Sequence, residues 1–223
     1  MSRKLRLSLL AAGCLLVLAA VALVALYSAA RYEPAFYRKA METDRAALEK
    51  GSDRMLQKAA ALQSSLAKVG HWEFLFTADE INGWLAVDLA RNHPHTLPPT
   101  LRDPRVAITP NEITVACRFE QSGLSSVVSL AVGPYVPEPN VVAVRIVRAR
   151  AGLLPLPLGA VLDRLSQAAG DLRLQLRWRH SGGDPVAMFS VPGDDGERIV
   201  RIETVRLGDG EIFIAGTTQR RAP

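Results

Sequence analysis

The stretch LSLLAAGCLLVLAAVALVALYSAA, residues 7–30, carries no charged side chain and is preceded by Arg3, Lys4 and Arg6. A helix of these 24 residues reaches ~36 Å, which is enough to cross a hydrocarbon core of roughly 30 Å. The basic residues before it are expected to stay in the cytoplasm, which places the following chain outside. The sequence therefore predicts a cytoplasmic tip and a single transmembrane anchor over residues 1–31.

Two other interpretations of this segment stay open. Residues 28–30 (SAA) offer a signal-peptidase site, although a signal peptide has a shorter apolar region, of about 7–15 residues. Cys14, preceded by residues 11–13 (AAG), resembles a bacterial lipoprotein site. We favour the uncleaved anchor, which predicts a single-pass protein of a bacterial inner (plasma) membrane, with its C-terminal domain periplasmic or extracellular.

Charge and cysteine content narrow the choice of partners. The 223 residues carry a formal charge of +5, and three of these charges belong to the basic tip before the apolar run. The part expected outside the membrane is therefore close to neutral and gives no reason to expect a nucleic-acid partner. Only Cys117 follows the apolar run, so the outer domain cannot form an internal disulfide bond and must depend on its hydrophobic core.

Residues 32–70 are predicted to form an amphipathic helix that begins near Pro34. Apolar residues recur at seven-residue spacing, at Met41, Leu48, Met55, Leu62 and Val69, joined by Ala59 and Leu66. The stripe predicts one helix, or two helices broken near Gly51, that packs on the domain's own sheet or stands as a stalk. A coiled coil between copies of the chain is a further alternative.

Residues 71–219 are predicted to form the extracytoplasmic domain, which begins with a strand and a helix. Apolar residues alternate over residues 71–76, as in a half-buried strand. Thr77 and Glu80 are spaced as a capping box, in which each side chain binds a backbone N–H of the first helical turn. The helix that follows is expected to end before Pro94.

Antiparallel strands are predicted for most of the remaining domain. From Pro104 onward, apolar and polar residues alternate in segments separated by glycine, proline and aspartate turns. Residues 141–147 are apolar on both faces apart from Arg145, which predicts a central strand. The predicted fold class is α+β, with a single N-terminal transmembrane helix, a helical stalk, and a curved, mostly antiparallel sheet of about nine strands with two or three packed helices. Residues 220–223 are expected to be a frayed tail.

The apolar segment AGLLPLPLG, residues 151–159, joins the strands to a further helix. It is interpreted as a buried crossover, as the apolar lip of a ligand groove, or as an edge that touches the membrane. For a groove, the candidate lining residues are Leu153, Leu154, Leu156, Leu158, Leu162 and Trp84.

A row of arginines is the second candidate site. Arg173, Arg177 and Arg179 share one face of a predicted strand, and they are expected to lie near other arginines, at positions 145, 148 and 150. One guanidinium group can bind two phosphate oxygens at once. The row is therefore a candidate contact for anionic lipid headgroups or another polyanion. The alternative is a solvated face, paired with acids such as Glu203 or Glu120.

No motif names a reaction. The sequence contains no Gly-x-Ser-x-Gly elbow, no phosphate loop, no dinucleotide fingerprint and no calcium loop. His93 and His95 could hold a metal ion only with a third ligand, which is not evident. We therefore expect no enzyme activity, no cofactor and no metal.

Two segments carry a resemblance to known families. The segments are FLFTADEINGWL (residues 74–85) and AGLLPLPLGAVLDRL (residues 151–165). They resemble the YpmS-type single-pass bacterial envelope proteins and, more remotely, the tubular lipid-binding (TULIP-like) domains. The matching positions are Thr77, Glu80, Asn82, Gly152, Pro155 and Pro157. The resemblance implies an apolar groove for acyl chains and no catalytic residues.

Two functional classes follow from these observations. The first is a membrane-anchored module that binds lipid or another apolar ligand in a groove of a curved sheet. The second is a protein-interaction or scaffold module of a cell-envelope assembly. The expected partners are the lipid bilayer, a lipid ligand and envelope proteins.

Overall fold

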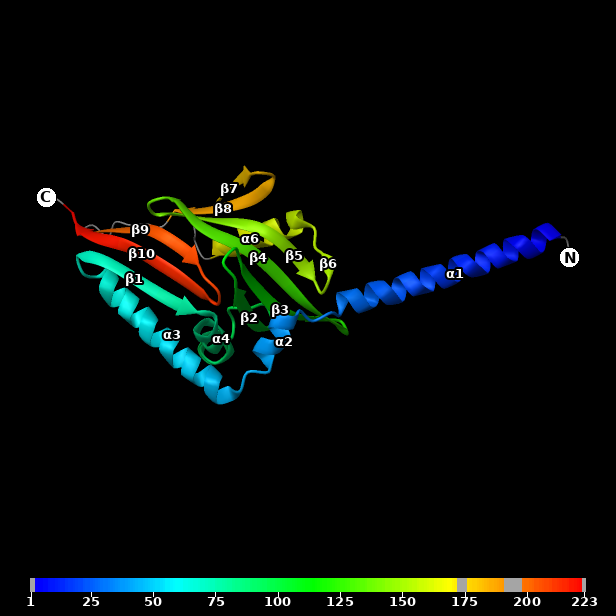
Figure 1. Ribbon diagram of the computed structural model, residues 1–223, viewed down its shortest axis with the longest axis horizontal. Coiled ribbons are helices and arrows are strands. Elements are labelled where there is room, and N and C mark those ends of the chain that lie inside the picture. Colours follow the sequence, from blue (N-terminus) through cyan, green and yellow to red (C-terminus); the bar gives the residue numbers. More distant parts are fainter. Residues whose placement is uncertain (1–2, 172–175, 191–197, 222–223) are drawn as a thin grey trace.

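The computed structural model describes residues 3–171, 176–190 and 198–221. A long helix, α1 (Arg3–Ala30), projects from an α+β body, and the N- and C-terminal ends lie at opposite extremes of the molecule (Figure 1). The other helices are α2 (Ala35–Met41), α3 (Arg45–Leu66), α4 (Ala78–Ala86), α5 (Asp88–Asn92) and α6 (Leu158–Asp171). The α+β class is confirmed.

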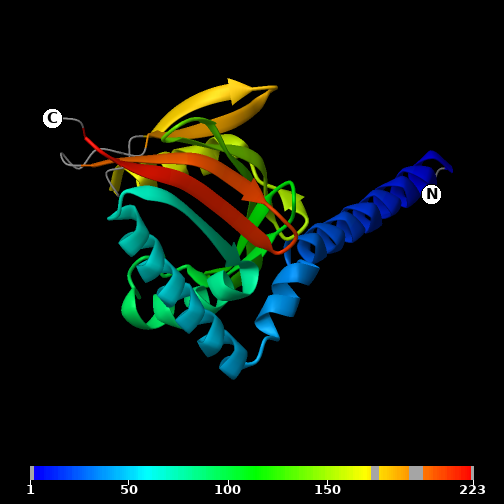
Figure 2. The same ribbon diagram turned by 60° about the vertical axis from the view of Figure 1, so that its left-hand side comes forward.

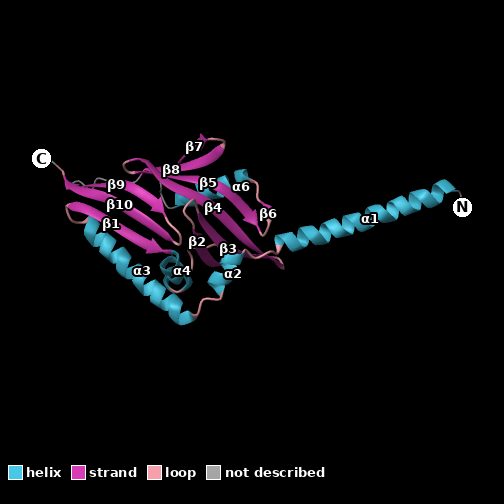
Figure 3. Ribbon diagram, viewed as in Figure 1, coloured by secondary structure: helices cyan, strands magenta, loops and turns pink. Residues whose placement is uncertain are grey.

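The strands form two antiparallel sheets (Figure 3). The small sheet has the order β1-β10-β9, and the large sheet has the order β2-β3-β4-β5-β8-β7, with β6 paired to β5. The prediction of one sheet of about nine strands is wrong, since the described residues form ten strands in two sheets. Their bounds are β1 (Gly70–Thr77), β2 (Leu101–Ile108), β3 (Ile113–Gln121), β4 (Leu124–Glu138), β5 (Val141–Ala151), β6 (Leu154–Pro155), β7 (Leu176–Ser181), β8 (Asp184–Ser190), β9 (Arg198–Leu207) and β10 (Glu211–Arg220).

From Val17 to Ala30, helix α1 is apolar on all of its sides, and it projects from the body. Val17, Leu18 and Leu23 point in widely different directions at about 100° per residue, yet each is more than half exposed. By length and composition, no single helix in the described part of the chain qualifies as a membrane span. Val17–Ala30 and α2 qualify only as a pair, bent by 48°. The transmembrane anchor therefore stays a prediction.

Helix α3 runs unbroken through Gly51 and packs against α4 and β1, so it is part of the body (Figure 2). The two helices cross at paired glycines. A Cβ on Gly51 would lie 2.7 Å from the Asp79 oxygen, and one on Gly83 would lie 2.5 Å from the Leu48 oxygen. Gly51 therefore serves close helix packing, and the alternative of a break near Gly51 is wrong, because the helices are separated between Met41 and Arg45.

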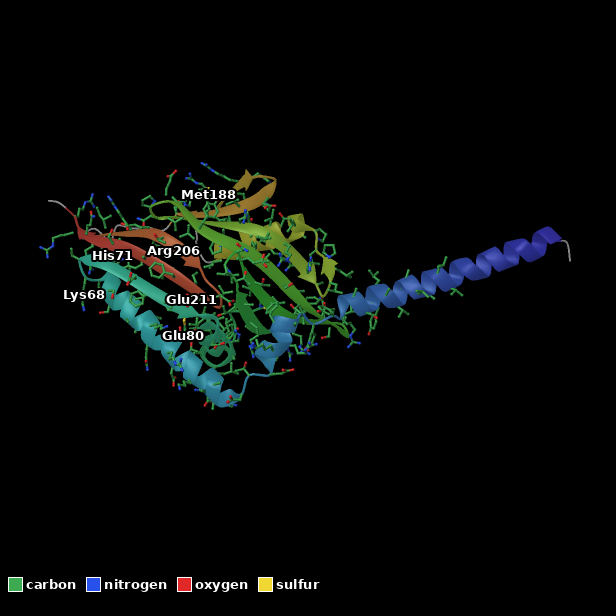
Figure 4. The ribbon with its side chains drawn as sticks, viewed as in Figure 1. Lys68, His71, Glu80, Met188, Arg206 and Glu211 are labelled. Carbon is green, nitrogen blue, oxygen red and sulfur yellow. The ribbon has the colours of Figure 1, made fainter. Side chains whose placement is uncertain are left out.

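The predicted capping box at the start of α4 is confirmed and is joined to α3. The Thr77 Oγ1 accepts from the Glu80 N–H at 3.3 Å, and Glu80 accepts from the Thr77 N–H at 3.0 Å. The Lys58 Nζ donates to Glu80 and to the Leu75 oxygen, both at 2.7 Å. Glu80 is 4% exposed, between α3 and the end of β1 (Figure 4). One lysine thus connects α3, β1 and α4.

Two asparagines join elements through backbone-like hydrogen bonds. The Asn82 side chain, on α4, donates to the Val106 oxygen at 2.9 Å and accepts from the Val106 N–H at 2.7 Å. It thereby covers the open edge of β2. Asn140, in the β4–β5 turn, donates to the Val200 oxygen and accepts from the Ile202 N–H, each at 2.7 Å. This second asparagine fastens the large sheet to β9.

The best-buried cluster lies where α2 covers the large sheet. Tyr37 is fully buried against Ala116 and Val127, and its hydroxyl donates to the Asp103 oxygen at 2.9 Å. Cys117 is buried on β3, and this burial, with the Asp103 charge, raises its pKa to about 11. The thiol is therefore neutral and unreactive at physiological pH.

Prolines were predicted to lie in turns between strands, and for two prolines of β4 that prediction is wrong. β4 continues through Pro134 and Pro137 to Glu138. Its pairing with β3 ends at Val132, so the later part of β4 is paired only with β5 on one side. Proline has no backbone N–H to donate, but on an open edge there is no neighbouring strand to accept that hydrogen bond, so none is lost. The prediction that the strand at residues 141–147 is central is confirmed, because β5 lies between β4 and β8.

Acid should lower the unfolding free energy of the body, because it protonates Glu80. Burial favours its neutral form, but the hydrogen bonds from Lys58 and Thr77 outweigh burial and lower its pKa below the ordinary 4.5. A lowered pKa contributes stability that is present above the unfolded-state pKa and is lost as the pH falls through the folded-state pKa. The Glu80→Gln variant should lose about 1–3 kcal/mol of unfolding free energy at neutral pH.

The measurement is chemical denaturation of the detergent-solubilised chain from neutral to acid pH. The difference between wild type and Glu80→Gln should shrink as the pH falls below the unfolded-state pKa of glutamate. A difference that stays constant with pH would contradict the role of the charge.

Candidate functional site

The C-terminal end of α1, Ala29 and Ala30, is held directly by the body and is called the foot of α1 below. The Leu153 N–H donates to the Ala29 oxygen at 2.9 Å, and the Ser126 Oγ donates to the Ala30 oxygen at 2.5 Å. The last carbonyls of a helix have no partner within the helix and need one from outside. Here Leu153 and Ser126 of the body each donate a hydrogen bond to one of these carbonyls. The end of α1 is therefore fixed directly to the body.

Gly152 permits this contact. Its φ of +59° lies in the left-handed region, and a Cβ at this position would lie 2.2 Å from the Ala29 oxygen. Its N–H donates to the Val127 oxygen at 2.8 Å, which fixes the turn against β4. Any side chain at this position would push α1 away from the sheet.

The predicted leucine segment lies beside this foot. Leu154 is in β6, which pairs with the end of β5, and Leu156 donates its N–H to the Ala149 oxygen at 2.9 Å. Leu158 and Leu162 are half-buried on α6, whereas Leu153 is 50% exposed. The segment is therefore only partly buried. It pairs with the end of β5 in the large sheet and leaves Leu153 exposed.

Trp84 lies elsewhere. It is on α4, which packs mainly on α3, α5 and β2, and its ring lies 6.4 Å from that of His93. The structure does not bring Trp84 together with the five leucines. His93 itself lies 3.8 Å from Asp88. In the described part of the chain, no three metal-ligating side chains of histidine, cysteine, aspartate or glutamate form a cluster.

A polar pocket of about 100 Å³ opens at the foot of α1. It is lined by Arg31, Glu33, Arg118, Ser125, Ser126 and Val127. The sequence analysis did not find this site, because its residues come from the end of α1 and from two strands and share no motif.

Charges in this pocket are only partly balanced. Arg118 donates to Glu33 at 3.0 Å, while its buried Nε has no partner within the described residues. Arg31 donates to the Tyr27 hydroxyl at 2.6 Å and lies over the Tyr27 ring. Two arginines and one glutamate leave a net charge of +1, and Arg118 has an unsatisfied donor.

Arginines gather on one face of the large sheet. Directly paired residues of antiparallel strands have side chains on the same face. Arg145 pairs with Val186, which pairs with Arg179, and Met188 pairs with Arg177. Met188 lies on β8, between β5 and β7 (Figure 4). By the same register, this arginine face comprises Arg102, Arg105, Arg118, Arg145, Arg148, Arg150, Arg177 and Arg179.

The arginine face is paired at one end and open at the other. Arg148 forms an ion pair with Glu112, and the Arg105 Nη1 donates to the Pro104 oxygen at 2.8 Å. Within the described residues Arg145, Arg150, Arg177 and Arg179 are exposed and form no ion pair. Helix α6 packs on the opposite face, where the Trp178 Nε1 donates to Ser166 at 2.8 Å.

The sequence correctly placed Arg177 and Arg179 on one face, near Arg145. Arg173 lies outside the described residues. The sequence analysis did not include Arg105 and Arg118 in the row. Both alternate with apolar residues on β2 and β3, but their membership depends on strand register, which a single sequence does not determine.

No family model, curated protein or solved structure matches this chain. The resemblance to envelope and tubular lipid-binding proteins therefore depends only on the segments quoted above.

A side chain at Gly152 should release α1 from the body. We expect Gly152→Ala to expose the peptide bond after Arg31, so that trypsin cleaves the detergent-solubilised chain there about 10-fold faster or more, because about 1–3 kcal/mol of strain favours local opening. Gly182→Ala is the matched control, since Gly182 has a φ of +62° but open space where a Cβ would lie. Equal cleavage rates in the two variants would contradict the clamp.

Proposed function

We propose that the chain is a membrane-tethered, non-enzymatic, lipid-binding module on the extracytoplasmic side of a bacterial inner membrane. The observation that supports this most strongly is the foot of α1, where a helix without a charged residue from 7 to 30 ends directly against the leucine segment of the body. A single apolar anchor thus holds a sheet-rich body close to a lipid surface.

The exposed surface of α1 supports the tether. Leu18 and Leu23 are 68% and 67% exposed, and apolar area left in water costs roughly 25 cal/mol per Å². A helix that is apolar all round needs a covering, either a protein core or a bilayer. The body contacts α1 at its last turn, beside β6, so the bilayer is the covering that fits.

The leucine segment supports lipid contact. Because it adjoins the end of the apolar helix, it would lie at the boundary between acyl chains and headgroups. Leu153 would insert at this boundary, while Leu154, Leu156, Leu158 and Leu162 offer half-buried apolar surface beside it. This assigns the lipid-binding role to the five leucines without Trp84.

The arginine face supports a preference for anionic partners. Four of its guanidinium groups have no acidic partner within the described residues, and such groups bind phosphate oxygens in pairs. Arg177 and Arg179 lie on β7, the terminal strand of the large sheet, where a headgroup or another polyanion could reach them.

A charge in the middle of α1 tests the tether. Leu23→Arg should abolish co-flotation of the full chain with phosphatidylcholine vesicles, because a charged residue at the centre of a span costs about 2.5–3.5 kcal/mol or more. Leu56→Arg is the control, since Leu56 is a 43% exposed leucine on α3, outside the anchor. Flotation that survives Leu23→Arg, or a wild-type chain that does not float, would contradict the proposal.

A further inference from the structure

The polar pocket at the foot of α1 has the chemistry of a phosphate site. The Arg118 Nε is buried and unpartnered, although Glu33 already holds the same guanidinium at 3.0 Å. That nitrogen has almost no accessible surface, but the Arg118 side chain as a whole is 32% exposed and lines the pocket, so its other N–H groups can meet a ligand. Arg31 and Ser125 add further donors to the same lining.

The charge and size of the pocket restrict the ligand. The lining has a net charge of +1, which matches a single negative charge. A volume of about 100 Å³ admits a small group of a few heavy atoms, with the rest of the ligand outside. Arginine and serine together are typical ligands of a phosphate oxygen.

The position of the pocket identifies the source of that phosphate. Arg31 follows directly on the apolar run, so in a membrane the pocket would lie at headgroup depth. Leu124, next to Ser125, is 64% exposed, and Leu153, bonded to the foot of α1, is 50% exposed. Two exposed leucines near a polar pocket would enter the acyl boundary and leave the pocket facing the headgroups.

We propose that this pocket binds the phosphate of one anionic phospholipid from the bilayer that holds α1. The inference rests on the proposed tether. The phosphodiester would accept hydrogen bonds from the Arg118 guanidinium, from Arg31 and from the Ser125 hydroxyl. Glu33 would orient that guanidinium through the hydrogen bond that it accepts from the Arg118 Nη2.

The test measures lipid retained by the full chain after release from nanodiscs made of equal parts phosphatidylcholine and phosphatidylglycerol. Native mass spectrometry of the wild type should show one bound phosphatidylglycerol. Arg118→Gln and Ser125→Ala should each lower the retained fraction, about 10- to 100-fold for the charged donor. Arg54→Gln, an exposed arginine on α3, is the matched control and should retain lipid as the wild type does.

Each result decides the question. Equal retention by wild type, Arg118→Gln and Ser125→Ala would overturn the site while leaving the tether intact. Displacement of the lipid by excess inorganic phosphate would show a free-phosphate site and overturn the lipid assignment. If Arg118→Gln fails to fold, Ser125→Ala and Arg31→Gln decide. Failure of the wild type to enter nanodiscs would instead reject the tether and, with it, this inference.

Discussion

The carbonyl groups at the end of α1 are the constraint on which the position of the whole body depends. They lack partners in their own helix, and the Leu153 N–H and the Ser126 hydroxyl supply them. Gly152 makes the approach possible because a Cβ there would collide with the Ala29 oxygen. Whatever surrounds α1 therefore also sets the orientation of the large sheet.

Elements of the body are joined by asparagine side chains, which form the hydrogen bonds that a strand backbone would form. Asn82 closes the edge of β2, and Asn140 fastens the β4–β5 turn to β9. Each amide donates to one backbone group and accepts from another, as a strand residue would. With only Cys117 beyond the apolar run, this part of the chain cannot form an internal disulfide bond, and these hydrogen bonds join its elements.

Local features were predictable from the sequence, and non-local ones were not. The capping box at Thr77 and the alternation of the β5 region depend on near neighbours, so they could be identified directly. The division into two sheets depends on pairings between distant segments, such as β1 with β10. The sequence left open a break near Gly51, because the contact of Gly51 with Gly83 on another helix cannot be seen from near neighbours. Part of the arginine face could be predicted, whereas the pocket around Arg118 required the fold.

Cys117 gives the molecule a built-in reporter. Its thiol is buried on β3 and has a pKa of about 11, so in the closed sheet it is both inaccessible and protonated. A thiol reagent can modify it once the structure around β3 opens and the thiolate is exposed to solvent. The rate of modification at this position would thus report the frequency of opening of the large sheet, with no label added to the chain.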